Sequence, residues 1–399
     1  MINITRTYAR MVWMVGILLA LGTSCSKDMD ETPARTIGQV TVNIASQSNL
    51  QTRTGLPVHD GKVDTEWVQG VQHVTDVYLY VFEQDEDKKD FTCRSMYDVR
   101  WSESVDRTED GKLPTTTSSI NYTIAYNFVV GKTYRLVAVG LDCAENVDEM
   151  QDFDGHNSAL TYGLPESIQP GNKLSQAIAT LQADKTTEDI MHSEFFVGEI
   201  EFSPSSYERG NIRTVELFRR VAGLQVCLDG IPEEVEQIRV LLYNSQNTQT
   251  YLLKNNPNDF ITSPYNGDIH DEEGRVLLDI KKDQFQTSVS GTDIADGSTT
   301  YKCGGTAYLL PIGKPDKERY DYTFMVEFIT TGITGIVGES KKVRLTRPYQ
   351  DDQLQFEDGY DIGTGIIDDL DKYLFPIKAN HFYCLGRPSV PIDCSQVFQ

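Results

Sequence analysis

Alternation of apolar and polar residues is the feature that most limits what this chain can fold into. Tyr122, Ile124, Tyr126 and Phe128 alternate with more polar residues, and residues 322–328 repeat the pattern. A period of two places successive side chains on opposite faces of an extended strand, whereas a helix needs a period near 3.6. Both segments are therefore predicted to be strands with one apolar face.

Three further runs are apolar on both faces: residues 77–82, 134–141 and 239–243. Such runs are typical of central strands that are covered on both sides. Asp-Gly and Asn-Gly dipeptides, which favour tight turns, separate the runs. They occur at residues 60–61, 110–111, 154–155, 229–230, 266–267, 296–297 and 358–359. The fold class predicted from these signals is all-β.

Two segments have a helical pattern. Residues 174–181 place Leu174, Ile178 and Leu181 on one helical face. Residues 232–238 begin with a proline, which suits the first turn of a helix, and continue with acidic residues near the positive end. We expect two short helices in an otherwise β protein.

The length of 399 residues exceeds what one hydrophobic core usually organises, so two domains are expected. Many short strands with regular turns are typical of β-sandwiches. The polar loop at residues 203–213 is the most natural junction. We therefore expect one β-sandwich domain at residues 39–214 and a second at residues 215–399.

The charge balance excludes some functions. The chain has 59 acidic and 36 basic residues, for a net charge of -23. Such a field repels nucleic acid, and no basic stripe reverses it. The six histidines are scattered, and neither HExxH nor CxxC occurs, so no local zinc motif is present. Nucleotide-binding and hydrolase motifs are also missing from the sequence, and we expect neither a cofactor nor enzymatic activity.

The amino terminus has the layout of an export signal. Arg6 and Arg10 precede the apolar residues 11–21, and small residues lead up to Cys25. Eleven apolar residues are too few to span a bilayer as a helix, which takes about 20. The alternative is a buried segment of the folded domain.

Residues 21–25 resemble the lipobox of bacterial lipoproteins, although Gly22 stands where leucine is usual. The resemblance implies a signal peptide at residues 1–24 and lipid, including an acyl chain such as palmitate, on Cys25. Residues 25–38 would form an acidic tether, and residues 26–31 are similar to a signal for the surface of the outer membrane. A plain solvated tether is the alternative interpretation.

Four blocks resemble the fimbrillin superfamily of type V pili, in particular its lipoprotein anchor and accessory subunits. They are residues 73–82, residues 131–140, residues 195–198 with 215–226, and residues 375–385. The resemblance implies two tandem transthyretin-like Greek-key β-sandwiches. It also implies assembly with other fimbrial subunits by strand complementation, in which a partner's strand fills an open groove.

Residues 39–44 are a candidate first strand, with Val40, Val42 and Ile44 on one face, between Arg35 and Arg53. Proteolytic cleavage after Arg53 would remove lipid, tether and strand together, as in stalk subunits of the family. The alternative is that Arg53 is an ordinary loop residue in an uncut anchor or tip subunit.

Several other residues have open interpretations. Cys384 and Cys394 are close enough in sequence to suggest a disulfide, and Val390, Ile392 and Cys394 alternate as in a short donor strand. Arg220 is predicted to share a strand face with Phe218 and Leu224, where it either pairs with a carboxylate between domains or extends into solvent. Residues 152–155 and 356–359 only partly match a calcium loop, so we expect no metal site there.

The sequence therefore predicts a non-enzymatic anchor or tip subunit of a fimbrium, attached by lipid to the outer membrane and exposed at the surface. It would contribute to cell adhesion, with a host or bacterial surface ligand. The alternative is a surface glycan-binding lipoprotein of a polysaccharide-uptake system. Exposed aromatic platforms at Trp67 and Trp101 would favour the alternative, because sugar rings stack on flat aromatic faces.

Overall fold

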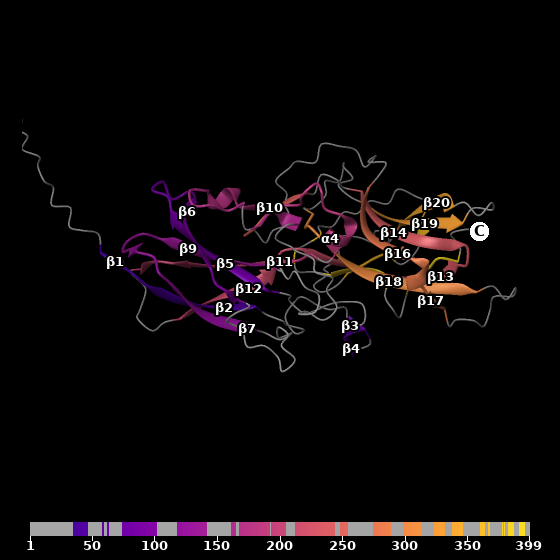
Figure 1. The fold of residues 1–399 in the computed structure, drawn as a ribbon, viewed down its shortest axis with the longest axis horizontal. Coiled ribbons are helices and arrows are strands. Elements are labelled where there is room, and N and C mark those ends of the chain that lie inside the picture. The colour runs from indigo at the N-terminus through magenta and orange to yellow at the C-terminus, as the bar shows by residue number, and fades with distance from the viewer. Residues whose placement is uncertain are drawn as a thin grey trace, which may run out of the picture.

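β-strands dominate the protein, as the alternating pattern predicts. The computed structural model describes residues 35–46, 58–59, 62–63, 74–101, 118–141, 161–164, 167–191, 193–204, 212–243, 248–253, 274–288, 299–312, 323–331, 337–345, 360–363, 366–367, 377, 379, 382–386 and 391–395. In these segments no helix is long and apolar enough to cross a membrane. The fold is all-β and consists of several packed sheets (Figure 1).

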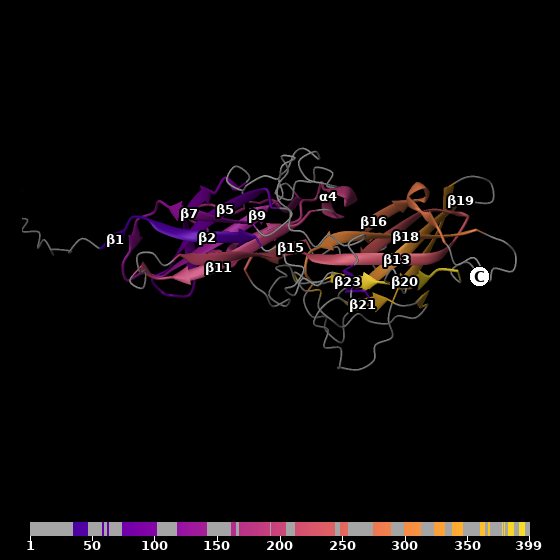
Figure 2. The ribbon, with the colours of Figure 1, turned by 90° about the horizontal axis from the view of Figure 1, so that it is seen from below.

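Seven strands form one hydrogen-bonded sheet in the amino-terminal half (Figures 1 and 2), in the order β6, β5, β9, β11, β12, β2, β7. Their bounds are β2 (Val40–Ser46), β5 (Asp76–Gln84), β6 (Phe91–Asp98), β7 (Ser118–Ile124), β9 (Tyr134–Leu141), β11 (Phe195–Phe202) and β12 (Arg213–Arg219). Neighbours are antiparallel except β2 and β12, which run parallel. β2, which comes first in the chain among these seven strands, is therefore an interior strand of the sheet.

The sheet folds over at the contact between β11 and β12, which pair over only two residues. Gly198 permits this close approach, because a Cβ there would lie 2.2 Å from the carbonyl oxygen of Glu216. Side chains of β2 and β12, such as Val42 and Val215, then share one core with Leu79 of β5 and Leu136 of β9. The two parts of the sheet thus pack face to face, as in a β-sandwich.

The predicted two-sided strands are confirmed. In β5, Val77, Leu79 and Val81 enter the core shared with β2, whereas Tyr80 and Phe82 enter a second core on the opposite face. Burial on both faces leaves few places for polar residues, which explains the near-continuous apolar run. Alternation at residues 122–128 is confirmed too, with Ile124 and Phe128 fully buried and the residues between them exposed or half-buried. The predicted strand is shorter than this segment, because β7 ends at Ile124 and residues 125–127 are not in a strand.

Two further sheets pack face to face in the carboxyl-terminal half. One contains β13 (Ala222–Pro232), β17 (Gln286–Thr287), β18 (Thr300–Leu309), β21 (Tyr360–Gly363), β23 (Phe382–Leu385) and β24 (Ile392–Asp393). The other contains β14 (Val235–Tyr243), β16 (Arg275–Lys281), β19 (Thr323–Thr331), β20 (Val337–Leu345) and β22 (Ile366–Ile367). Leu224 and Val226 of β13 meet Val240 of β14 and Phe328 of β19 in the core between them.

Short elements complete the described part of the chain. They are β1 (Thr36–Ile37), β3 (Val58–His59), β4 (Lys62–Val63), β8 (Phe128–Val129), β10 (Ile178–Thr180), β15 (Gln249–Tyr251), the α-helix α4 (Thr187–Met191) and the 3-10 turns η2 (Leu174–Gln176) and η5 (Lys282–Gln284). The pairs β1–β8, β3–β4 and β10–β15 are two-stranded sheets.

Both helix predictions are wrong. Residues 174–181 form the 3-10 turn η2 followed by β10, because pairing of β10 with β15 overrides the local helical pattern. Residues 232–238 span the end of β13 and the start of β14. There the proline and acids lie at a tight turn that carries the chain from one sheet to the other, and the branched Val235 and Ile238 face the core.

The expected boundary between residues 214 and 215 falls inside β12, whose strand partners β11 and β2 belong to the amino-terminal half. The division into tandem domains, with its transthyretin-like topology, stays a prediction. The strand pairing places the last residues of β12 with the preceding half of the chain.

Arg219 and Glu194 form a buried ion pair where the two halves meet. Nε of Arg219 donates to Oε2 of Glu194 at 2.5 Å, and the side chains are 1% and 0% exposed. The guanidinium lies 5.5 Å from the ring centre of Phe196 in β11 and 5.4 Å from that of Tyr308 in β18. Burial acts to lower the pKa of Arg219, but the Glu194 carboxylate raises it overall.

Arg220 and Phe218 differ in part from expectation. Arg220 is buried and its Nη2 donates to the carbonyl of Tyr251 at 3.1 Å, so it does not extend into solvent. Phe218, expected on the apolar face with Leu224, is instead exposed. The chain leaves β12 at Arg219 and begins β13 at Ala222, and this break resets the alternation between the two strands.

The suggested disulfide between Cys384 and Cys394 is wrong. Cys384 lies opposite Gln225 of β13, and Asp393 lies opposite Asp229 of the same strand. Four residues along a strand span about 13 Å, whereas a disulfide needs Cα atoms within about 7 Å. Cys394 is a buried free thiol, as are Cys93, Cys227 and Cys303.

We predict that Glu194→Ala lowers the free energy of unfolding by about 3–5 kcal/mol, because it leaves the Arg219 charge buried without its partner. Replacing both residues with methionine costs much less, since no charge is then buried. Urea denaturation of the purified proteins measures the free energy of unfolding of each variant. Glu201→Ala, which breaks an exposed pair with Arg135, is the control and costs about 1 kcal/mol or less. Equal losses for Glu194→Ala and the control would contradict the assignment.

Candidate functional site

Strand β2 is the candidate functional site because it joins the amino-terminal segment to the folded core. All seven residues of β2 pair with β7, and residues 42–46 also pair with β12. Backbone groups on both edges of β2 are therefore used in the sheet. The predicted strand at residues 39–44 is confirmed, and it lies between two neighbours.

The inward face of β2 is fully apolar. Val40, Val42 and Ile44 are almost completely buried, as predicted, and they pack with Val215 and Leu217 of β12. Complete burial of one such side chain contributes roughly 1.5–3 kcal/mol. Removal of β2 would therefore expose an apolar groove as well as two unpaired strand edges.

The outward face of β2 is held by side-chain hydrogen bonds to β7. The hydroxyl oxygens of Thr41 and Thr123 lie 2.9 Å apart, and Nδ2 of Asn43 donates to Oδ1 of Asn121 at 3.0 Å. These exposed contacts contribute modestly to stability, but they fix the register between the two strands.

The chain enters β2 through β1 at one end of the molecule. Thr36 and Ile37 pair with Val129 and Phe128 of β8, and the carbonyl of Arg35 accepts a hydrogen bond from Val130 at 2.8 Å. Figure 2 shows β1 at the end of the long axis that is remote from β19 and β20. A force applied through the amino-terminal segment would therefore act on β1 and β2.

Glu83, near the end of β5, stabilises the turn between β8, which pairs with β1, and β9. Its carboxylate accepts hydrogen bonds from Lys132 at 2.8 Å, Arg94 at 3.2 Å and the Tyr134 hydroxyl at 3.2 Å. The Tyr134 oxygen also accepts from the amide of Val129 in β8 at 2.9 Å. Burial acts to raise the pKa of Glu83, but the hydrogen bond and charge of Lys132, with Arg94 and Tyr134, hold it below its usual value.

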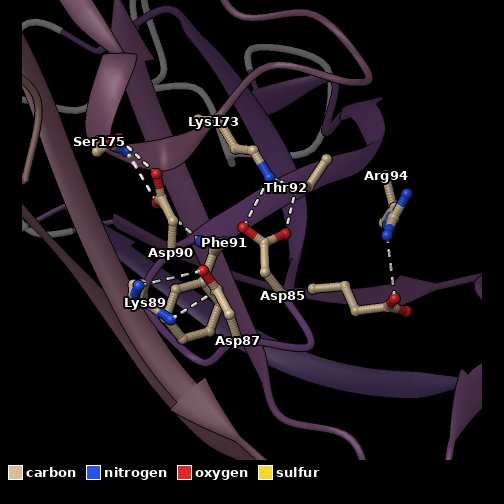
Figure 3. A network of polar contacts seen from close by, with 10 residues as sticks. Asp85, Asp87, Lys89, Asp90, Phe91, Thr92, Arg94, Lys173 and Ser175 are labelled. Atoms are coloured by element: carbon tan, nitrogen blue, oxygen red, sulfur yellow. Dashed lines mark hydrogen bonds and ion pairs between the residues drawn. The ribbon is translucent and has the colours of Figure 1, made fainter.

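A second set of polar contacts closes the outer edge of the sheet (Figure 3). Asp85 accepts hydrogen bonds from Lys173 and from Thr92, both at 2.6 Å, and Asp90 accepts from Ser175. These contacts hold residues 171–175 against β6, where the Cys93 amide donates to the carbonyl of Asn172 at 2.8 Å. Covering an edge strand in this way blocks unwanted pairing with other chains.

Some residues singled out from the sequence lie outside the described part of the chain: Cys25, Arg53 and Trp67. Residues 152–155 and 356–359 also lie outside it. Arg35 is exposed just before β1. Trp101 is only 2% exposed, so it offers no platform for a sugar ring. Among the described residues, no cluster of three or more histidine, cysteine or acidic side chains could hold a metal ion.

Of the three alternating residues in the tail, Val390 lies outside the described residues, whereas Ile392 and Cys394 lie within the folded protein. β24 pairs with β13, and the side chains of Ile392 and Cys394 are fully buried in the carboxyl-terminal core. Gly386, directly after β23, has a φ of +75°, a conformation that other residues rarely adopt. In this state the tail fills a place in its own sheet and is not a free donor strand.

The Glu83 contacts were missed by sequence reasoning. A signal existed, since Glu83 directly follows an apolar run that is buried on both faces. A carboxylate at such a position needs cationic partners. The partners Lys132 and Arg94 are distant in sequence or on the next strand, and pattern alone does not identify them.

We predict that Ile44→Ala lowers the free energy of unfolding by about 2–5 kcal/mol, because it leaves a cavity beneath an interior strand. Thr41→Ala, on the outward face of the same strand, is the control and costs about 1 kcal/mol or less. Thermal and denaturant unfolding measure both. If Ile44→Ala costs no more than the control, β2 is not a required part of the sheet.

We predict that Glu83 makes the protein sensitive to acid. Its pKa is lower in the folded state than the usual 4.5, so its contribution is present above about pH 4.5 and is lost as the pH falls toward the folded-state value. Glu83→Gln should therefore lower stability at pH 7 and flatten the dependence on pH below 5. Glu234→Gln, at an exposed position, should keep the wild-type profile. An unchanged profile in Glu83→Gln would refute this role.

Three solved structures are similar to this chain over 76% to 78% of its length. The fimbrial anchor protein Mfa2 from Porphyromonas gingivalis is 12% identical, with a TM-score of 0.33 over 76% of this chain and 82% of that chain. A fimbrial assembly protein from Parabacteroides distasonis is 10% identical, with a TM-score of 0.35 over 78% and 86%. The tip fimbrial protein Mfa3 from Porphyromonas gingivalis, with a C-terminal truncation, is 10% identical, with a TM-score of 0.30 over 78% and 83%.

A search of curated protein sequences gives no match. The family model described as "Fimbrillin-A associated anchor proteins Mfa1 and Mfa2" matches residues 69–339, which is more than half of the chain. The match begins before β5 and ends within β20, so it includes most strands of both halves. This is a family of fimbrial structural proteins and not of enzymes. The chain belongs to the fimbrillin-A associated anchor protein family.

Proposed function

We propose that this protein is the lipid-anchored anchor subunit of a type V fimbrium. Cys25 is the first residue of the mature chain and carries the acyl chains, after removal of residues 1–24. Residues 26–35 form the tether, since Thr36 and Ile37 already belong to β1, and the folded part lies outside the outer membrane. One lipid chain gives marginal membrane binding, whereas the two or more of a bacterial lipoprotein give stable anchoring.

The observation that carries this proposal is the position of β2. The tether continues through β1 into an interior strand that is paired on both edges and buried on one face. A lipid attached to the segment before such a strand would hold the whole sheet at the membrane, because β2 cannot leave the sheet without breaking its pairing on both edges. Family membership supports a fimbrial role for the anchored protein.

We propose that Arg53 stays uncut in the mature protein. Cleavage there would leave β2 held without a covalent link to the sheet, and its loss would expose the groove lined by Val215 and Leu217. In a stalk subunit that groove accepts the next subunit's strand. In this protein β2 fills the groove, which suits a subunit at the base of the polymer.

We propose that other fimbrial subunits attach by strand complementation at a site other than the position of β2. The carboxyl-terminal β24 is paired with β13, and its apolar side chains are buried. The tail of this protein therefore offers no extended donor strand among the described residues. The partner subunit is then the one that supplies the strand, and any adhesive ligand binds through the assembled fimbrium.

The anchor is tested with Cys25→Ala in cells that produce the fimbriae. We predict at least a tenfold fall in membrane-bound protein, with fimbriae released into the medium, because the variant lacks acyl chains. Ser26→Ala is the control and should leave both protein and fimbriae on the cells. Membrane fractions and shed fimbriae are measured by immunoblotting. Retention of Cys25→Ala in the membrane with attached fimbriae would reject the anchor role.

A further inference from the structure

The outward face of β12, β2 and β7 carries an unusual set of side chains. Ile212 and Phe218 are 51% and 46% exposed, and they are the large hydrophobic residues that lie exposed in the described part of the chain. Both belong to the outward row of β12, one just before the strand and one near its end. They are about 20 Å apart at 3.3 Å per residue.

The surface between these two residues is almost free of charge. Thr214 of β12 aligns with Asn43 and Asn121, and Glu216 aligns with Ala45 and Ser119. Glu216 is the one ionisable group in these rows, although the chain carries a net charge of -23. Two such acidic chains repel each other over most of their surface, and a neutral face is where like-charged copies can approach.

The exposed side chains of this face can match those of a second copy of the same face. The centre of the match is the row formed by Val215, Ile44 and Ile120, which are paired residues on neighbouring strands. Ile212 and Phe218 lie three residues to either side of Val215. Consider a two-fold axis that lies between the two sheets, perpendicular to the strands, at the level of Val215. It would place Phe218 of each copy against Ile212 of the other copy, which gives two equivalent contacts. It would also place Glu216 opposite the Thr214 hydroxyl of the second copy and not opposite a second carboxylate.

The side chains on this face are also held in place before any contact forms. The bonds between Thr41 and Thr123 and between Asn43 and Asn121 fix the central rows. Fixed side chains lose little entropy on association, which favours a contact of limited area.

We propose that two copies of this chain pair face to face through the outward side of β12, β2 and β7, with the strands of the two copies antiparallel. The face is smaller than the roughly 800 Å² per partner of a standard interface, so the pairing is weak between free molecules. Confinement to one membrane raises the local concentration and populates it. This last step rests on the proposed lipid anchor, whereas the contact itself does not.

The experiment uses full-length protein on intact cells. Ile212→Cys and Phe218→Cys chains with different tags are co-expressed and treated with a short bis-maleimide crosslinker. We expect a crosslinked dimer that contains both tags, and about tenfold less product from either variant alone, because each residue faces the other one. Wild-type protein controls for reaction of the native cysteines. Equal crosslinking of Phe218→Cys alone would overturn the antiparallel arrangement, and mixed product no greater than wild type would overturn the contact.

A charge variant gives a second measurement. Thr214→Asp in both tagged chains sets a carboxylate opposite Glu216 and should lower the crosslinked fraction about tenfold, which corresponds to 1.4 kcal/mol. Thr287→Asp, at another exposed threonine, in β17, should leave the crosslinked fraction within about twofold. An equal decrease of the crosslinked fraction in Thr214→Asp and Thr287→Asp would overturn the proposal. Protein found in the medium would instead show failure of the anchor, and the same crosslinking is then done on that protein after purification and concentration.

Discussion

The pairing of β2 with both β12 and β7 is the constraint on which the rest of this structure depends. β7 has no other partner in the described sheet, and β12 meets β11 over only two residues. Without β2 this layer would lose the strand that connects its members and the side chains that fill the core above β5 and β9. β2 is thus as necessary to the sheet as any strand that follows it in the chain.

In the chain, β2 directly follows β1 and the amino-terminal segment before it. β1 and β8 pair at the end of the molecule, and the Glu83 contacts with Lys132 and Tyr134 hold the turn that follows β8. At the other end of β12, Arg219 is stacked between Phe196 and Tyr308, and it pairs with Glu194. The β10–β15 pair adds backbone hydrogen bonds between the halves. Load from the amino terminus is therefore passed to the carboxyl-terminal half through buried contacts.

Strands with strong periodicity could be predicted from the sequence, because their side chains report directly on burial. β2 and β7 are of this kind, whereas β5 and β9 are predicted from runs that are apolar on both faces. The failures have a different origin. Residues 174–181 have a helical pattern, but they pair with a strand more than 60 residues away in the chain. The burial of Arg219 and the exposure of Phe218 depend on a break between two strands that alternation does not reveal. The Glu83 contacts join groups brought together only by the fold.

Short motifs at Cys25 and Arg53 raise two questions: whether the mature protein carries lipid, and whether proteolysis removes β2. Because β2 lies between these residues and inside the sheet, one measurement answers both. The most direct test is the amino terminus of protein extracted from the cell surface, determined by mass spectrometry of its first peptide. The account predicts a chain that begins at lipid-modified Cys25 and still contains residues 40–46. A chain that begins at Thr54 would contradict it, because the anchor and β2 would then be missing from the assembled protein.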